Sequence, residues 1–113
     1  MKDEETIERV NPEHIEAAHA CHQTVLMTIK HCLKHGGDHV AAKHLTLLMD
    51  CEGICHLHED FLLRGSHHHH AICKACEELC EECASSCDSF GDDKPMKACA
   101  QACRRCAEVC RMM

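Results

Sequence analysis

Apolar or thiol-bearing side chains recur three and four residues apart along four stretches of the chain, with polar residues between them. This spacing returns a side chain to the same face of an α-helix at every turn. Short connections that contain glycine separate the four stretches. The pattern therefore predicts four helices, over residues 11–35, 39–63, 67–89 and 95–112.

The connections carry the residue types that end one helix and begin the next. Asn11, followed by proline, is typical of a helix start. Residues 36–38 and 64–66 each place a glycine before a polar residue, so we expect Asp38 and Ser66 to cap the helices that follow. Four helices joined by short connections favour an all-α fold, an antiparallel four-helix bundle.

The thirteen cysteines all fall on the inward positions of these predicted helices. In the last two helices they follow one another in alternating steps of three and four residues, which is a heptad seam built of thiols. The pattern therefore predicts a bundle core lined with sulfur. The seam cysteines are Cys21, Cys32, Cys51, Cys55, Cys73, Cys76, Cys80, Cys83, Cys87, Cys99, Cys103, Cys106 and Cys110.

Antiparallel stacking of the four seams predicts six layers across the core. The layer at one end holds His14, Leu62, His69 and Met113. The next layer holds Ala18, His58, Cys73 and Cys110, and a layer of four thiols follows: Cys21, Cys55, Cys76 and Cys106. The remaining layers are Val25, Cys51, Cys80, Cys103; then Thr28, Leu48, Cys83, Cys99; then Cys32, His44, Cys87, Met96.

Soft thiolate ligands select copper(I), zinc or iron–sulfur clusters. A long seam in which each thiol has two or three neighbours suits copper(I), which accepts few ligands, better than it suits closed zinc sites with four. Charge points the same way, because one copper(I) per thiolate leaves a neutral core whereas four thiolates per zinc do not. We therefore expect about one Cu(I) per cysteine, held in clusters whose loading releases protons.

Composition and charge indicate the number of domains and the cellular compartment, and they argue against one class of partner. The chain of 113 residues suits one domain, with a polar tail at 1–10 and the copper-binding bundle at 11–113. The thirteen cysteines cannot all pair within one chain, and no export signal or membrane-spanning run is recognisable, so we expect a cytoplasmic protein with reduced thiols. A net charge of -7 and two aromatic residues argue against a nucleic-acid partner.

The run of cysteines from Cys73 to Cys87, together with the segment 98–110, resembles the cysteine-rich four-helix-bundle copper storage proteins of bacteria. The resemblance implies Cu(I) storage without catalysis, a homotetramer of bundles and membership of a cytosolic branch. Val25, Thr28 and Leu48 stand where richer members of the family often place cysteine. A copper chaperone or a low-molecular-weight thiol would then be the donor.

The histidines divide by their place relative to the seam. His14, His58 and His69 lie at one end with Met113, where imidazole and thioether groups suit a relay that passes copper inward. Solvated helix ends are the competing interpretation. The histidines off the seam are expected at the surface: His19, His22, His31, His39 and His56.

Two other functions fit the same cysteines. The C-x-x-C pairs in the last two helices have zinc-like spacing. Two runs match the cluster spacing of radical enzymes, but a 113-residue bundle has no room for the barrel that such enzymes need, so we interpret both as coincidental. A zinc protein or a redox protein with an iron–sulfur or disulfide centre therefore remains the alternative. Inert core cysteine is the third interpretation.

Overall fold

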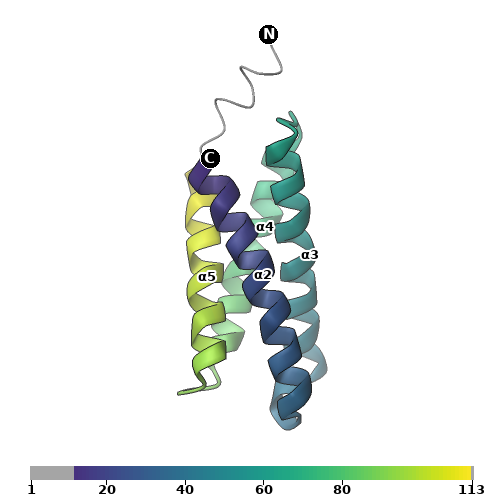
Figure 1. The fold of residues 1–113 in the computed structure, drawn as a ribbon, viewed down its shortest axis with the longest axis vertical. Helices are drawn as coiled ribbons and strands as arrows, with labels where there is room; N and C mark the ends of the chain where they lie inside the picture. The colour runs from purple at the N-terminus through teal and green to yellow at the C-terminus, as the bar shows by residue number, and fades with distance from the viewer. Residues whose placement is uncertain (1–11, 113) are drawn as a thin grey trace.

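The computed structural model describes residues 12–112 and contains four long helices in an antiparallel bundle (Figure 1). Each helix packs against two neighbours: α2 against α3 and α5, and α4 against α3 and α5. The helices are α2 (Pro12–His35), α3 (Ala42–Leu63), α4 (His69–Asp88) and α5 (Lys94–Arg111), with a short 3₁₀ helix, η1, over Gly37–Val40. The predicted all-α bundle is confirmed.

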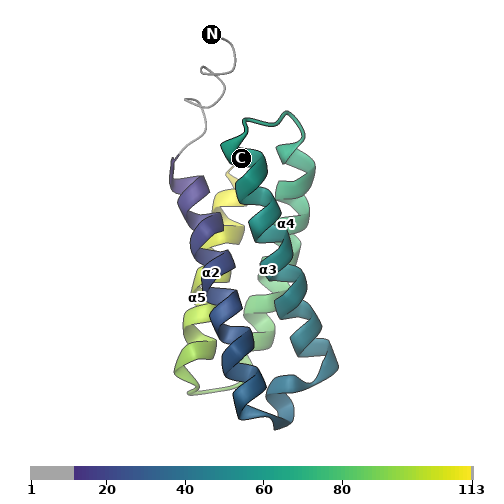
Figure 2. The ribbon, with the colours of Figure 1, turned by 45° about the vertical axis from the view of Figure 1, so that its right-hand side comes forward.

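The chain returns at each connection, so consecutive helices lie side by side (Figure 2). The N-terminus of α2 and the C-terminus of α5 consequently lie at the same end of the bundle. The proposed tail, the cap at Asn11 and the side chain of Met113 fall outside the described residues.

Two of the predicted caps are wrong. Asp38 lies inside η1, and α3 begins after Ala41, which is extended and gives no side-chain cap. Ser66 accepts a hydrogen bond from the backbone N–H of His68 at 3.1 Å, which closes a turn before α4 begins. In both connections a glycine with positive φ, Gly37 or Gly65, makes the chain turn before it can enter the next helix.

Asp93 supplies a side-chain cap at the start of α5. Its Oδ1 accepts a hydrogen bond from the backbone N–H of Met96 at 3.1 Å, and a proline occupies the first turn of α5. This combination satisfies a helix-start donor and fixes where α5 begins.

The core combines sulfur with small and apolar side chains. The buried alanines of α4 and α5, Ala84, Ala100 and Ala107, are each at most 1% exposed and let neighbouring helices approach closely. Leu48, Val25 and Met96 fill the remaining volume and are fully buried. Within residues 12–112, no helix combines the length and hydropathy that crossing a membrane requires.

Candidate metal centre

All thirteen cysteines point into the bundle and are at most 5% exposed. No disulfide joins any of them in the structure of residues 12–112. Because every helix contributes cysteines at its inward positions, the sulfur atoms form a column along the bundle axis rather than a single cluster at one level.

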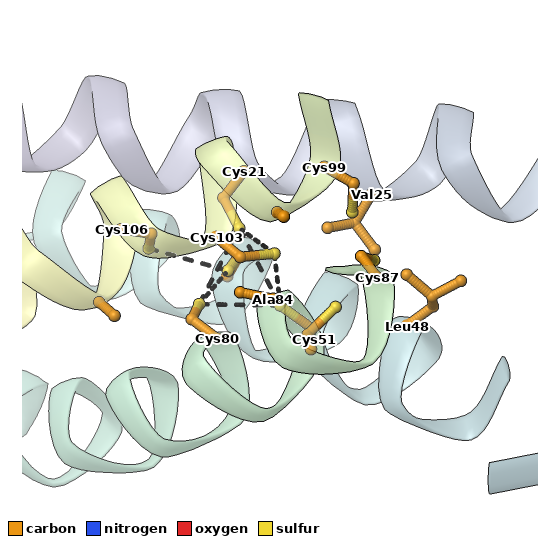
Figure 3. Packing of buried hydrophobic residues seen from close by; sticks show 14 of the residues in the cluster. Cys21, Val25, Leu48, Cys51, Cys80, Ala84, Cys87, Cys99, Cys103 and Cys106 are labelled. Carbon is orange, nitrogen blue, oxygen red and sulfur yellow. Dashed lines mark hydrogen bonds between the residues drawn. The ribbon is translucent and has the colours of Figure 1, made fainter. Parts of the chain in front are cut away.

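The centre of the column is a group of four thiols, one from each helix (Figure 3). The Sγ of Cys21 lies 4.0 Å from that of Cys51, 3.9 Å from Cys80 and 3.8 Å from Cys103. The Sγ of Cys51 is 3.7 Å from Cys80 and 3.8 Å from Cys103. The four helices thus bring their sulfurs into direct contact at this level.

A second group adjoins the first. The Sγ atoms of Cys55, Cys76 and Cys106 are separated by 3.6–3.9 Å. Cys80 connects the groups, because its Sγ is 3.6 Å from Cys55 and 3.8 Å from Cys76 as well as in contact with the central four. Several thiols therefore belong to two potential metal sites at once.

Most cysteines contact the neighbours that the predicted layers assign to them, but Cys21 does not. The layer expected to join Cys21 with Cys55, Cys76 and Cys106 contains the last three in mutual contact. Cys21 instead contacts Cys51, Cys80 and Cys103, although its sulfur is still within 4.8 Å of Cys55 and Cys106. It therefore lies between two layers.

The end of the column near the N-terminus of α2 is the His58 end. There the Nδ1 of His58 lies 3.8 Å from the Sγ of Cys110, and the Cys73 thiol donates to the carbonyl oxygen of Cys110 at 3.2 Å. The ring of His58 is fully buried, and its Nε2 makes no hydrogen bond to any described residue. One atom each from His58, Cys76, Cys106 and Cys110 lie within 4.8 Å of one another, which forms a mixed nitrogen–sulfur group.

The other predicted residues of the His58 end are more exposed. His14 and His69 are half-buried, and the Nδ1 of His69 donates to the carbonyl oxygen of Ser66 at 2.8 Å. His69 is thus oriented by the turn before α4. The exposed Met112 follows the last residue of α5 and so lies at the same end of the bundle.

The opposite end of the column, the His44 end, also mixes ligand types. The Sγ of Cys32 lies 3.6 Å from the Nε2 of His44 and 3.8 Å from the Sδ of Met96. The Nδ1 of His44 hydrogen-bonds with the hydroxyl of Ser86 at 2.7 Å, which fixes the ring with its other nitrogen toward sulfur. Phe90 packs on the ring of His44 with centroids 4.6 Å apart.

Between the central four and the His44 end, the column is partly filled by other side chains. Cys83, Cys99 and Cys103 bring their sulfurs within 4.8 Å of one another, and Cys87 lies in the same buried cluster. Val25 and Leu48 belong to that cluster too (Figure 3). Thr28 is buried and donates its hydroxyl hydrogen to the carbonyl oxygen of Thr24 at 2.8 Å, so that the polar group is satisfied within its own helix.

Burial and neighbouring groups set the protonation of the thiols. Burial raises the pKa of Cys32 to about 11, and the nearby Asp93 and Cys99 add to the effect. The surrounding thiols, followed by burial, raise the pKa values of Cys80 and Cys103. The hydrogen bond with Cys110, supported by His58, lowers the pKa of Cys73 to about 5. Neighbouring thiols lower the pKa values of other interior cysteines, among them Cys51 and Cys106. Thiols with raised and lowered pKa values therefore alternate within the column, and its His58 end includes one of the lowered thiols.

His39 is buried, and its expected surface position is therefore wrong. Its Nε2 donates to Oδ2 of Asp93 at 2.8 Å, and its ring stacks on His35 and contacts Phe90. His31 donates to the same carboxylate oxygen at 3.0 Å. Seam spacing could not find this cluster, because His39 lies in η1 and is brought to Asp93 by the two glycines before it.

The arrangement as a whole suits several small soft cations. Neighbouring sulfur atoms are 3.6–4.0 Å apart, so two or three of them could bind the same small ion. Shared thiols such as Cys80 would bridge neighbouring ions, and the mixed groups at both ends add imidazole and thioether donors, which bind soft metals less strongly than thiolate does.

The comparisons with known proteins agree with this geometry. The family model described as "Csp: Copper storage protein" matches residues 7–113. A crystal structure of the Nmul_A1745 protein from Nitrosospira multiformis is 39% identical, with a TM-score of 0.83 over 96% of this chain and 94% of that one. The Cu(I)-bound copper storage protein BsCsp3 is 32% identical, with a TM-score of 0.82 over 88% of this chain and 93% of that one. The curated proteins contain no match. On this basis, the chain belongs to the copper storage protein family.

Proposed function

We propose that this protein stores several Cu(I) ions on the thiolates of its bundle core and so contributes to copper homeostasis. The observation that carries the proposal is the continuity of the sulfur column. The central four thiols and the group of Cys55, Cys76 and Cys106 share Cys80, so that ions bound at one level have ligands in common with ions bound at the next. A protein built for one catalytic metal needs a single site with an open position, whereas repeated closed gaps favour storage over catalysis.

Zinc is the alternative with a specific structural basis. The central four thiols could surround one ion, as in a closed zinc site. Two features favour Cu(I). A dication among four buried thiolates leaves two uncompensated negative charges, and buried charge is costly. In addition, zinc at the central four and at the group of His58, Cys76, Cys106 and Cys110 would leave six of the thirteen cysteines outside both sets.

All thirteen cysteines are proposed as ligands, from Cys21 in α2 to Cys110 in α5. His14, His58, His69 and Met113 are proposed as a relay that passes copper between solvent and the column. The position of His58 supports this role, because its Nδ1 lies 3.8 Å from the Sγ of Cys110 at the end of the bundle where α2 and α4 begin with the half-buried His14 and His69.

Further proposals concern the cellular compartment, the copper donor and the oligomeric state. Storage on thirteen thiols requires reducing conditions, so the cytoplasm is the proposed compartment, and a copper chaperone or low-molecular-weight thiol the proposed donor. Large apolar side chains on the outside of α2 and α3 support a homotetramer, since Met27, Leu33 and Met49 are more than half exposed.

Anaerobic titration of the reduced protein with Cu(I), in competition with a chromophoric Cu(I) chelator, tests the storage proposal. We expect saturation near one ion per cysteine, so on the order of ten or more per chain, with release of protons. Saturation at one to three equivalents would refute it. A parallel titration with zinc, and the colour of the purified protein, would separate the zinc and iron–sulfur alternatives.

A further inference from the structure

A group of possible ligands also lies on the outside of the bundle, where α2 and α3 meet. One ligand atom each from His22, Glu52 and His56 lie within 4.8 Å of one another. The imidazole rings of His22 and His56 have centroids 4.6 Å apart and are tilted by 32°. His22 comes from α2, whereas Glu52 and His56 stand one helical turn apart on α3, so the group bridges two helices.

The contact between His22 and Glu52 is close but poorly directed. The Nδ1 of His22 lies 3.1 Å from Oε1 of Glu52, yet this buried ring nitrogen makes no hydrogen bond of acceptable geometry with any residue between 12 and 112. Two ligands bound to one tetrahedral zinc ion at about 2.1 Å are about 3.4 Å apart, and both direct their lone pairs at the ion rather than at each other. A nitrogen and an oxygen that are close without being aligned fit that arrangement.

The chemistry of the group differs from that of the core. Two imidazoles and one carboxylate are ligands of divalent ions such as Zn²⁺, whereas Cu(I) prefers the thiolates inside. Charge also favours a dication, because Oδ2 of Asp60 lies 3.7 Å from the Nε2 of His56 and supplies a second carboxylate beside Glu52. The side chains remain reachable from solvent, with His22 16%, Glu52 23% and His56 55% exposed.

We propose that His22, Glu52 and His56 form an external site for one divalent d-block cation, Zn²⁺ being the best match, separate from the Cu(I) column. Asp60 orients His56 or neutralises the bound ion. The site joins α2 to α3 beside Gly53, a mid-helix glycine with open space around it that weakens α3 locally. Bound zinc therefore stabilises the α2–α3 contact without occupying a thiol.

The test uses the Cu(I)-saturated protein, whose thiolates are already occupied, and measures Zn²⁺ binding by calorimetry. The double variant His22→Asn/His56→Gln is expected to lose one zinc equivalent relative to the parent. Glu52→Gln is expected to weaken that equivalent by about tenfold or more, because loss of even an outer-shell partner costs about 10–100-fold. Circular dichroism before and after copper loading checks that each variant is folded.

His19→Asn is the matched control, because His19 makes a similar pair with Glu59, 2.9 Å away, and does not belong to the group of His22, Glu52 and His56. It should retain the parent's zinc equivalent. All variants keep residues 67–70, so zinc bound by that histidine run is the same in each. Co²⁺ serves as a spectroscopic probe, and thiolate charge-transfer absorption would show that the ion enters the core instead. Either that absorption or equal zinc binding by the parent and the folded double variant would overturn the proposal.

Discussion

The Nδ1 of His58 lies 3.8 Å from the Sγ of Cys110, while the Nε2 of the same fully buried ring makes no hydrogen bond to any residue from 12 to 112. An unsatisfied buried nitrogen costs about 1–3 kcal/mol. A soft metal ion bound through Nε2 would give that nitrogen a partner. This geometry is compatible with the proposed relay, in which His58 would bind copper transiently.

The first prediction concerns this relay. Replacing His14, His58 and His69 together, as His14→Gln, His58→Leu and His69→Gln, should slow copper uptake and removal by about tenfold or more, which corresponds to about 1.4 kcal/mol of barrier. Capacity should be nearly unchanged, because the thiol column remains. Stopped-flow transfer from a Cu(I)-chelator complex measures the rates, and metal analysis measures the capacity.

A single substitution at the opposite end of the column, the His44 end, provides the comparison. His44→Leu alters a ring that contacts Cys32, far along the bundle from His58. If that variant slows uptake and the triple variant does not, copper enters at the His44 end and the relay is wrong. A large loss of capacity in the triple variant would make its histidines storage ligands.

The second prediction concerns the apolar side chains that interrupt the column. Val25→Cys adds a thiol to the buried cluster that contains Cys99 and Cys87, so the Cu(I) capacity should rise by about one ion per chain. The loss of volume should cost about 1 kcal/mol in the free energy of unfolding of the copper-free protein. Leu26→Cys is the control, because Leu26 is 46% exposed and a thiol there has no buried partners. Equal capacity gains in both variants would contradict the prediction.

The third prediction is that the bundle folds without metal. The sulfurs of the core are already in contact without metal, and Leu48, Leu62 and Met96 are buried beside them. Packing of this kind stabilises helices independently of ligand binding. Circular dichroism of the reduced, copper-free protein should therefore show a helical spectrum and a cooperative thermal transition. A largely unfolded spectrum that becomes helical on adding Cu(I) would be the opposite result.

The fourth prediction concerns pH and Asp93. Burial alone raises the pKa of Asp93, but the hydrogen bonds from His31 and His39 outweigh it and lower the pKa from 3.8 to about 2. A carboxyl whose pKa is lower in the folded protein stabilises it fully above its ordinary pKa, and this contribution is lost as the pH falls toward 2. Asp93→Asn should therefore lower the melting temperature of the copper-free protein near neutral pH.

Between pH 4 and 2, the same variant should lose less stability than the parent does. Asparagine can still cap α5, so the comparison isolates the charge on the carboxylate. Asp92→Asn is the control, because Asp92 is exposed and pairs with Lys97 at the surface. An unchanged acid dependence in Asp93→Asn would show that His31 and His39 do not stabilise the carboxylate.

The bundle and the sulfur column were predictable because both depend on spacing within single helices. Steps of three and four residues from Cys73 to Cys87 and from Cys99 to Cys110 leave the thiols only one common face. The level at which each helix meets the others depends on the connections. That is why Cys21 lies between two predicted layers, although every other member of its layer was placed correctly.

Features made by turns or by two neighbouring helices escaped the spacing rules. His39 is off the seam in sequence, but Gly36 and Gly37 have positive φ and direct η1 back over the end of the bundle, where His39 meets Asp93. The pairing of His22 with His56 depends on the relative rotation of α2 and α3, which helical periodicity alone does not specify.

The sulfur contacts around Cys80 have a consequence for how this protein can change. In the empty protein, the side chain of Cys80 is an apolar filler packed against Cys51, Cys55 and Cys76. In the proposed Cu(I)-loaded state, the same atom would be an anionic donor to more than one ion. A replacement at such a position would have to pack in an apolar core when the protein is empty and bind a cation when it is loaded. Among the common side chains, only the thiol does both. Substitutions should therefore accumulate at the outward positions of the helices, and the inward cysteines should remain unchanged.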